Sequence, residues 1–180
     1  MSSKSALALA LLGTALVFGS PGHAQQPAPP AAANPLDAVP DKIPFDVPYG
    51  APISLERAQA AIAATVTEAK KRDWKFNVAV VDSGGNLVAF QRMDGAQLAS
   101  IQISEHKARA AATFRRETKA FENGIQLNNL IYSLTLDGII ASRGGIPLVE
   151  GGKLIGAIGC SGGTGSQDEV ACKAGAALFK

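Results

Sequence analysis

The stretch that decides the fold class is Phe76–Met93, FNVAVVDSGGNLVAFQRM. Residues 76–81 form an apolar run typical of a buried strand, and residues 87–93 resume the strand pattern after the turn residues of 82–86. Two strands joined by so short a loop run antiparallel, so this stretch predicts a β-hairpin. The glycines at 84 and 85 would supply the positive φ angles that the turn needs.

A second hairpin is predicted at the other end of the chain, where strands 146–149 and 153–160 are joined through Glu150-Gly-Gly. Residues 138–141 predict one more strand. Helices are predicted over 54–72, 99–114 and 166–179, with 117–136 as one or two helical turns broken at Gly124. The order α-β-β-α-α-β-β-β-α therefore predicts an α+β domain, with a mostly antiparallel five-stranded sheet covered by helices.

The first 52 residues do not share this pattern. Residues 1–24 combine Lys4, an apolar run and a small-residue cleavage site after Ala24, which is typical of a signal peptide. Residues 25–52 are rich in proline and alanine and predict a linker or arm, so the domain is expected over 53–180. We therefore expect a periplasmic or secreted protein without a membrane span after processing.

The charge balance argues against nucleic acid as a partner. The chain has 17 basic and 15 acidic side chains, a formal net charge of +2, whereas proteins that bind nucleic-acid phosphates concentrate far more positive charge. Removing residues 1–24 takes away Lys4 and leaves 16 basic against 15 acidic side chains. The cysteines, Cys160 and Cys172, fit no zinc-binding spacing. The sequence leaves open whether they form a disulfide, since the distance between them depends on the fold.

His106 is the one histidine that remains after signal-peptide removal. It lies in mid-helix and shares a helical face with Arg109, while Lys107 is its immediate neighbour. A lone surface histidine is often just solvated, but one imidazole can also serve as an axial ligand of haem iron. On this reading Lys107 or Arg109 would pair with the propionates, and Met93, Cys160 or another subunit could supply the second ligand.

A different hypothesis uses Arg92, Asp94 and Arg143 in a pocket at a subunit interface. Arginine would hold the carboxylate of an organic acid, and the aspartate would transfer a proton. A third hypothesis is a signalling partner without chemistry of its own, which contacts another protein through the arm at 25–52. The loop at 159–166 is expected to serve a tight passage from strand to helix or a subunit contact, because Asp168 and Glu169 already occupy the start of that helix.

Several motifs, in order, resemble the GlcG/HbpS-like family, also called DUF336 or haem-degrading proteins, which includes the C-terminal domain of PduO-type proteins. The resemblance spans nearly all of 53–180. The motifs are Val80–Leu87, Arg92–Ala96, Lys107–Phe114, Gly144–Pro147, Gly156–Gly163 and Asp168-Glu169.

The resemblance implies a compact α+β subunit that forms a homo-oligomer, often an octamer. It implies haem as a cofactor, either bound or degraded, or a corrinoid ligand in some members. An extracytoplasmic member of this family is similar to a haem-sensing accessory protein that partners a membrane sensor kinase. For this chain the resemblance therefore implies a membrane sensor or a periplasmic enzyme as partner. Thr113, Lys107, Arg92 and Asp94 fall in the matched motifs and become pocket or interface candidates.

Overall fold

The computed structural model describes residues 34–43 and 45–179. These residues fall into two compact units that divide after Pro40. In the first unit a short 3-10 helix, η1 (Pro35–Asp37), is held by the Asn34 side chain, which accepts a hydrogen bond from the Leu36 N–H. The predicted signal peptide, 1–24, and residues 25–33 of the predicted linker lie outside the described residues.

The second unit holds the α+β domain that the sequence predicts. Its elements in order are α1 (Leu55–Lys71), β1 (Asn77–Asp82), β2 (Leu87–Arg92), α2 (Ser100–Thr113), α3 (Lys119–Asn128), the 3-10 helix η2 (Ile131–Thr135), β3 (Gly145–Glu150), β4 (Lys153–Ser161) and α4 (Gly165–Ala176). The strands form one antiparallel sheet in the order β2-β1-β4-β3. The hairpin at 76–93 and the hairpin at the other end of the chain are both confirmed.

The sheet has four strands rather than the predicted five. Residues 138–141, which were expected to form a strand, are irregular. Gly138 has a φ of +82°, which no strand adopts, and the following Ile139 lines a cavity beside α3 instead of pairing with the sheet. The apolar run at 138–141 therefore reflects packing against α3 and not a strand. The sequence could not separate the two, because a short apolar run has the same composition in a buried strand and in a buried irregular segment.

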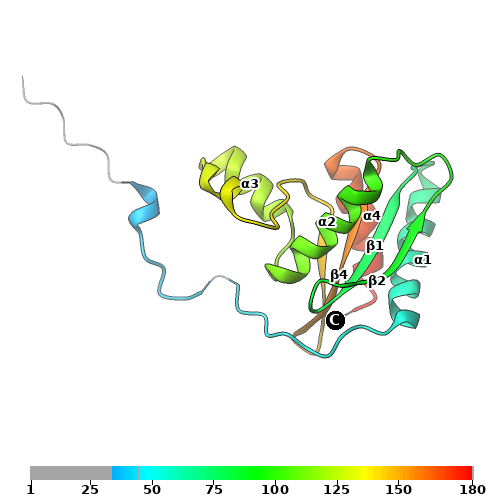
Figure 1. Cartoon of the computed structure of the whole chain (residues 1–180), viewed down its shortest axis with the longest axis horizontal. Helices are drawn as coiled ribbons and strands as arrows, with labels where there is room; N and C mark the ends of the chain where they lie inside the picture. The colour runs from blue at the N-terminus through cyan, green and yellow to red at the C-terminus, as the bar shows by residue number, and fades with distance from the viewer. Residues whose placement is uncertain (1–33, 44, 180) are drawn as a thin grey trace, which may run out of the picture. The chain divides into compact units, whose positions relative to one another are not determined.

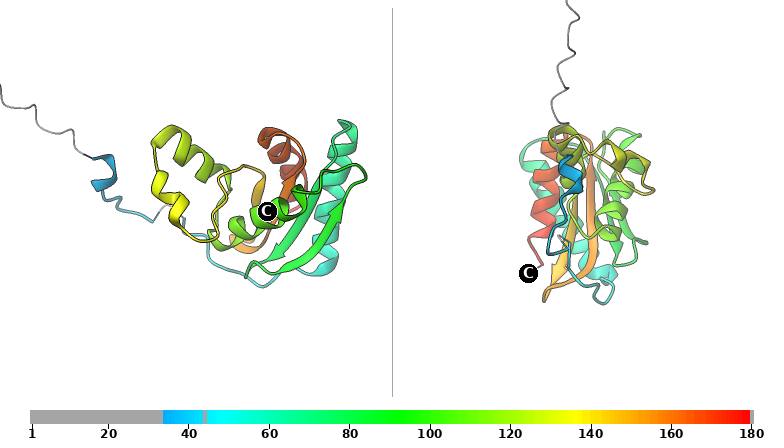
Figure 2. Two further views of the ribbon diagram at one scale, coloured as in Figure 1. Left: turned by 45° about the horizontal axis from the view of Figure 1, so that its top comes forward. Right: turned by 90° about the vertical axis from the view of Figure 1, so that its left-hand side faces the viewer.

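Helices cover both faces of the sheet (Figures 1 and 2). α2 packs on one face, and α1 and α4 pack side by side on the other. The core under α1 and α4 contains large side chains such as Ile62, Val80 and Ile158, whereas the core under α2 consists mainly of alanines. Gly159 of β4 permits this close approach, since a Cβ there would overlap the Ser104 carbonyl oxygen.

A disulfide and side-chain caps fix the helices on the α1 and α4 face. Cys160 of β4 is bonded to Cys172 of α4, with Cα atoms 5.7 Å apart and both residues fully buried. This settles the pairing that the sequence left open. α4 begins with a capping box in which Thr164 and Gln167 each bond the other's backbone, and Ser54 caps α1.

Part of the predicted linker belongs to the folded domain. The Gly50 N–H donates to the Leu154 carbonyl over 2.7 Å, and the Leu154 N–H donates to the Pro48 carbonyl over 2.8 Å. The Tyr49 hydroxyl also donates to the Thr113 carbonyl at the end of α2. The backbone from residue 48 onward therefore runs beside the first residues of β4.

α3 and η2 form a lobe that stands to one side of the sheet, next to the C-terminal end of α2 (Figures 1 and 2). The sequence predicted a break at Gly124, but α3 continues through it to Asn128 and is capped by Asn129, which has a φ of +53°. Gly124 is buried against Leu130, whose N–H donates to the Gly124 carbonyl, so this glycine serves packing and the helix end.

Candidate functional site

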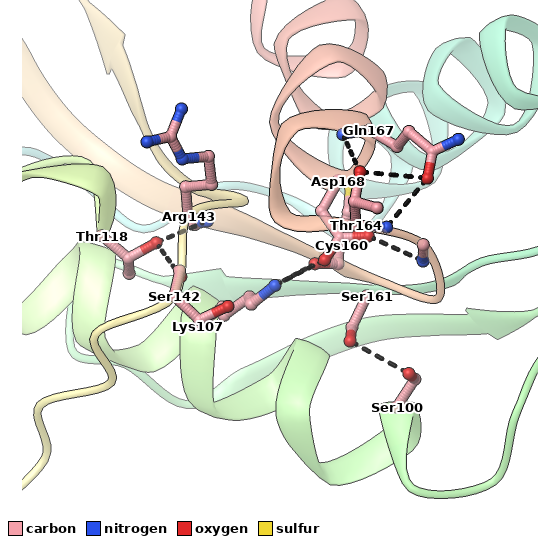
Figure 3. A network of polar contacts seen from close by, with 12 residues as sticks. Ser100, Lys107, Thr118, Ser142, Arg143, Cys160, Ser161, Thr164, Gln167 and Asp168 are labelled. Carbon is pink, nitrogen blue, oxygen red and sulfur yellow. Dashed lines mark hydrogen bonds and ion pairs between the residues drawn. The ribbon is translucent and has the colours of Figure 1, made fainter. Parts of the chain in front are cut away.

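Lys107 points from α2 into the interior of the protein and forms an ion pair with Asp168 of α4 (Figure 3). Its Nζ donates to the Asp168 Oδ2 over 2.7 Å and to the Cys160 carbonyl over 3.2 Å, and the two side chains are 1% and 4% exposed. Burial raises the pKa of Asp168, although Lys107 and the Gly163 N–H act against that rise. The Lys107 amine is therefore engaged inside the fold and does not face a ligand on the surface.

The glycine-rich motifs meet around this ion pair. Gly144, at φ +115°, has room for no side chain, because a Cβ there would lie 2.8 Å from the Asp168 Cβ and 3.2 Å from the Lys107 Nζ. Thr118 completes the junction, since its hydroxyl donates to the Ser142 carbonyl and accepts from the Gly145 N–H (Figure 3). The junction joins α2, β3, β4 and α4, so these motifs hold the fold together.

The loop after β4 makes the tight passage that the sequence predicts. The Gly163 N–H donates to the Asp168 Oδ1 over 3.0 Å, which confirms that this carboxylate occupies the start of α4. Gly162 passes so close to the Lys75 carbonyl that a Cβ would overlap it. An anion would therefore meet a carboxylate at this helix start.

Arg143 lies in a cluster of opposite charges. Its Nε donates to the Glu122 Oε1 over 2.8 Å, and its Nη1 lies 3.4 Å from a Glu169 oxygen. Lys119 and Lys173 also bond Glu169. Arg143 therefore joins the α3 lobe to α4, with its charge already matched by two carboxylates.

Arg92, Met93 and Asp94 lie at the other edge of the sheet from Arg143. They line a cavity of about 350 Å³ together with Val66, Lys70, Lys75 and Gln91. Arg92 ends β2 and Arg143 precedes β3, and these are the two edge strands. Three strand spacings of about 4.8 Å separate the edges, so one chain does not bring Arg92 and Asp94 together with Arg143.

His106, Arg109 and Thr113 share the outer side of α2. His106 is half-buried, while Arg109 and Thr113 are exposed and follow it at helical spacings of three and seven residues. The Thr113 hydroxyl donates to the Arg109 carbonyl over 2.9 Å. Gly85 of the hairpin turn, at φ +83°, packs against both of these side chains and supports this part of α2.

Some of the predicted haem residues fit a haem group and others do not. A half-buried imidazole with an exposed guanidinium one turn away suits an axial ligand and a propionate partner. Lys107 does not fit, because its amine is buried against Asp168. Met93 belongs to the core under α1, on the opposite face of the sheet from α2, and Cys160 is held in the disulfide.

A second cavity, of about 320 Å³, was not anticipated from the sequence. It lies between the end of α2 and the α3 lobe. Phe114, Arg116 and Phe121 line it, but they lie at the end of α2, in the turn after it and in α3, so no single helical spacing links them in the sequence. The other half of its wall comes from η2 and the irregular residues after it, which the sequence assigned to helix and strand.

The fold and these motifs define a class of small α+β domains with a helix-covered antiparallel sheet and a buried Lys–Asp junction. The family model described as "Haem degrading protein HbpS-like" matches residues 53–177. The chain therefore belongs to the HbpS-like family, as the sequence motifs indicated.

Known proteins agree with this assignment. Protein GlcG of Escherichia coli K12 is 43% identical over 109 residues, which cover 61% of this chain and 81% of GlcG. The crystal structure of a double mutant of Streptomyces reticuli HbpS is similar with a TM-score of 0.65 and 28% identity, covering 85% of this chain and 98% of that chain. A PduOC:heme complex is similar with a TM-score of 0.65 and 25% identity, covering 72% and 96%.

Within the part of the chain that the structure describes, no helix is both long enough and apolar enough to cross a membrane.

Proposed function

We propose that this protein is an extracytoplasmic haem-binding protein that works as a homo-oligomer. The observation that carries the proposal is the outer side of α2, where the half-buried His106 imidazole lies one helical turn from the exposed Arg109 guanidinium. The chain belongs to a family described by haem degradation, and a similar structure is a complex with haem. Both support haem as the ligand.

The roles of the residues follow from their positions on α2. His106 would hold the haem iron through its imidazole, and Arg109 would hold a propionate by charge-assisted hydrogen bonds. Thr113 borders the same surface one turn further on. Bound haem would supply the redox-active iron, which serves haem sensing and haem degradation alike.

A second copy of the chain would complete this site. His106 lies on the flank of a helix and does not line either of the cavities described above. One helix flank covers one face of a flat macrocycle, so the other face needs a further surface. We therefore propose a homo-oligomer, and the family resemblance implies an octamer. Its downstream partner would be a membrane sensor or a periplasmic enzyme.

The disulfide supports an extracytoplasmic location. Disulfides persist in oxidising compartments such as the periplasm and are rare in the reducing cytosol. The Cys160–Cys172 bond is fully buried and joins β4 to α4, so it forms part of the folded domain. Together with the signal-peptide pattern of residues 1–24, it favours a periplasmic or secreted protein.

The test is a hemin titration of residues 25–180, followed at the Soret band. We expect His106→Ala to shift the band and to weaken binding at least about tenfold, which corresponds to roughly 1.4 kcal/mol. Arg109→Ala should weaken binding by a smaller factor without moving the band, since it touches only the propionate. Glu56→Ala, an exposed change on α1, is the control. Absence of binding to the wild-type protein would overturn the proposal.

A second candidate function rests on the cavity lined by Arg92 and Asp94. Lys70 and Lys75 also line it, so the cavity combines three cationic side chains with one carboxylate. This arrangement favours an anionic small molecule, an organic acid or a corrinoid side chain, whose carboxylate Arg92 would hold while Asp94 would transfer a proton elsewhere on the molecule. The hemin titration distinguishes the two functions, because Arg92→Ala should leave hemin binding unchanged if the α2 surface holds haem.

A further inference from the structure

The cavity beside the α3 lobe combines an apolar wall with one positive charge. It measures about 320 Å³ and is lined by Phe45, Phe114, Arg116, Ala120, Phe121, Gly124, Asn128, Leu130, Tyr132, Ser133, Leu136 and Ile139. Most of these side chains are aromatic or aliphatic, and Arg116 is the cation among them. The residues of the proposed haem surface, His106 and Arg109, are not part of this wall.

Arg116 lies among aromatic rings. Its guanidinium carbon lies 3.2 Å from the centre of the Phe45 ring, 5.2 Å from that of Phe121 and 6.0 Å from that of Phe114. These distances are typical of cation–π contacts, which orient the guanidinium and stabilise it in part. Its Nε donates to the Phe114 carbonyl over 3.1 Å.

Arg116 has no counter-charge within residues 34–43 and 45–179. None of the ion pairs formed by these residues includes it, whereas its neighbours in the α3 region, Lys119 and Arg143, are paired with glutamates. Burial lowers the pKa of Arg116, and the nearby Tyr132 acts in the opposite sense. A partly desolvated cation of this kind gains free energy from an anion placed beside it.

The hydrogen-bonding groups, the volume and the wall of the cavity limit which anions it can bind. A guanidinium binds a carboxylate through two parallel hydrogen bonds, and its two terminal nitrogens make no hydrogen bond to the described residues. The cavity is near the lower end of ligand pockets, which range from about 300 to 1,000 Å³, so it suits one ring rather than a porphyrin. The rest of the wall is apolar and favours a hydrocarbon body.

We infer that this cavity is a binding site for a small aromatic or branched aliphatic carboxylate, whose acid group pairs with Arg116 and whose body packs between Phe114, Phe121 and Leu130. The site goes beyond the proposed haem function and does not depend on it, because it uses the end of α2 and the α3 lobe instead of the His106 surface.

The test uses calorimetric titration with phenylacetate and with its uncharged analogue phenylacetamide. We expect phenylacetate to bind and phenylacetamide to bind at least about tenfold more weakly, because a hydrogen bond to a charged group contributes on that scale. Arg116→Gln should produce the same loss for phenylacetate. Arg115→Gln is the matched control, since Arg115 contacts Tyr49 and the Val47 carbonyl and does not line the cavity.

A second variant tests the site independently if Arg116→Gln unfolds the lobe. Ala120 is exposed and lines the cavity, so Ala120→Phe should block the site and abolish binding while circular dichroism stays unchanged. The inference is overturned if phenylacetate does not bind the wild-type protein, if phenylacetamide binds equally well, or if a folded Arg116→Gln or Ala120→Phe variant binds phenylacetate with unchanged affinity.

Discussion

The side chain of Lys107 shows most clearly how sequence position and structural role can differ. It follows His106 directly in a helix that carries several basic residues, and so the sequence favoured a role at a ligand. In the fold it points the other way, together with Ser104 and Ala108, and its amine meets Asp168. The helical spacing could have indicated the buried face, but the partner lies 61 residues away and depends on how α4 returns to the sheet.

The first residue-scale prediction concerns this ion pair. Lys107→Met should lower the free energy of unfolding by roughly 3–5 kcal/mol, because it leaves the Asp168 carboxylate buried without its partner. Adding Asp168→Leu should recover part of the loss, since the orphaned charge is then removed. Urea unfolding measures both. Lys153→Met, at an exposed lysine, is the control, and an equally small effect of both lysine changes would contradict the structural role.

At the scale of elements, the sequence predicted the hairpins correctly and the region between α2 and β3 less well. The hairpin at 76–93 follows from local pattern alone, because its two strands are joined by a short turn. Residues 138–141 were assigned to a strand, although Ile139 packs into the cavity by the α3 lobe. The walls of that cavity come from distant segments, so the candidate site there could not be predicted.

The disulfide provides a test at the scale of elements. Cys160→Ala combined with Cys172→Ala should lower the free energy of unfolding by about 2–4 kcal/mol, since the cross-link that ties α4 to β4 is lost. Wild-type protein unfolded in urea with a thiol reductant should show a similar shift of the midpoint. An unchanged midpoint in both experiments would show that the disulfide does not contribute to stability.

The acidic cluster that joins α3 to α4 predicts a pH dependence. Burial acts to raise the pKa of Glu122 and Glu169, but the hydrogen bonds and charges of Arg143, Lys119 and Lys173 outweigh it, so both pKa values lie below the ordinary one. These groups therefore add stability above the unfolded pKa of about 4.3, and the addition is lost as the pH falls through their folded values.

Comparison with a variant separates the contribution of Glu122 and Glu169 from that of Asp168. The raised pKa of Asp168 has the opposite effect on how stability depends on pH. Arg143→Met removes the main partner of Glu122, so its unfolding free energy should fall less than that of the wild type between pH 6 and the acid range. Parallel pH profiles for the two proteins would contradict the role of the cluster.

At the scale of the whole molecule, the limit of the folded domain can be tested by truncation. Backbone hydrogen bonds to β4 begin at Pro48, and the Val47 carbonyl accepts a hydrogen bond from Arg115. Removal of residues 25–40 should therefore leave the melting temperature of the domain unchanged. Removal of residues 25–52 should lower it, because the contacts of Tyr49 and Gly50 are lost. Equal melting temperatures would place 48–52 outside the cooperative unit.

The central claim for the whole molecule is that His106 binds haem iron. The most direct measurement is the electron paramagnetic resonance spectrum of the ferric hemin complex, recorded for wild type and for His106→Ala. We predict that the imidazole-ligation signature of the wild type is lost in His106→Ala and is restored when free imidazole is added. The same spectrum in both proteins, with no response to imidazole, would contradict the claim.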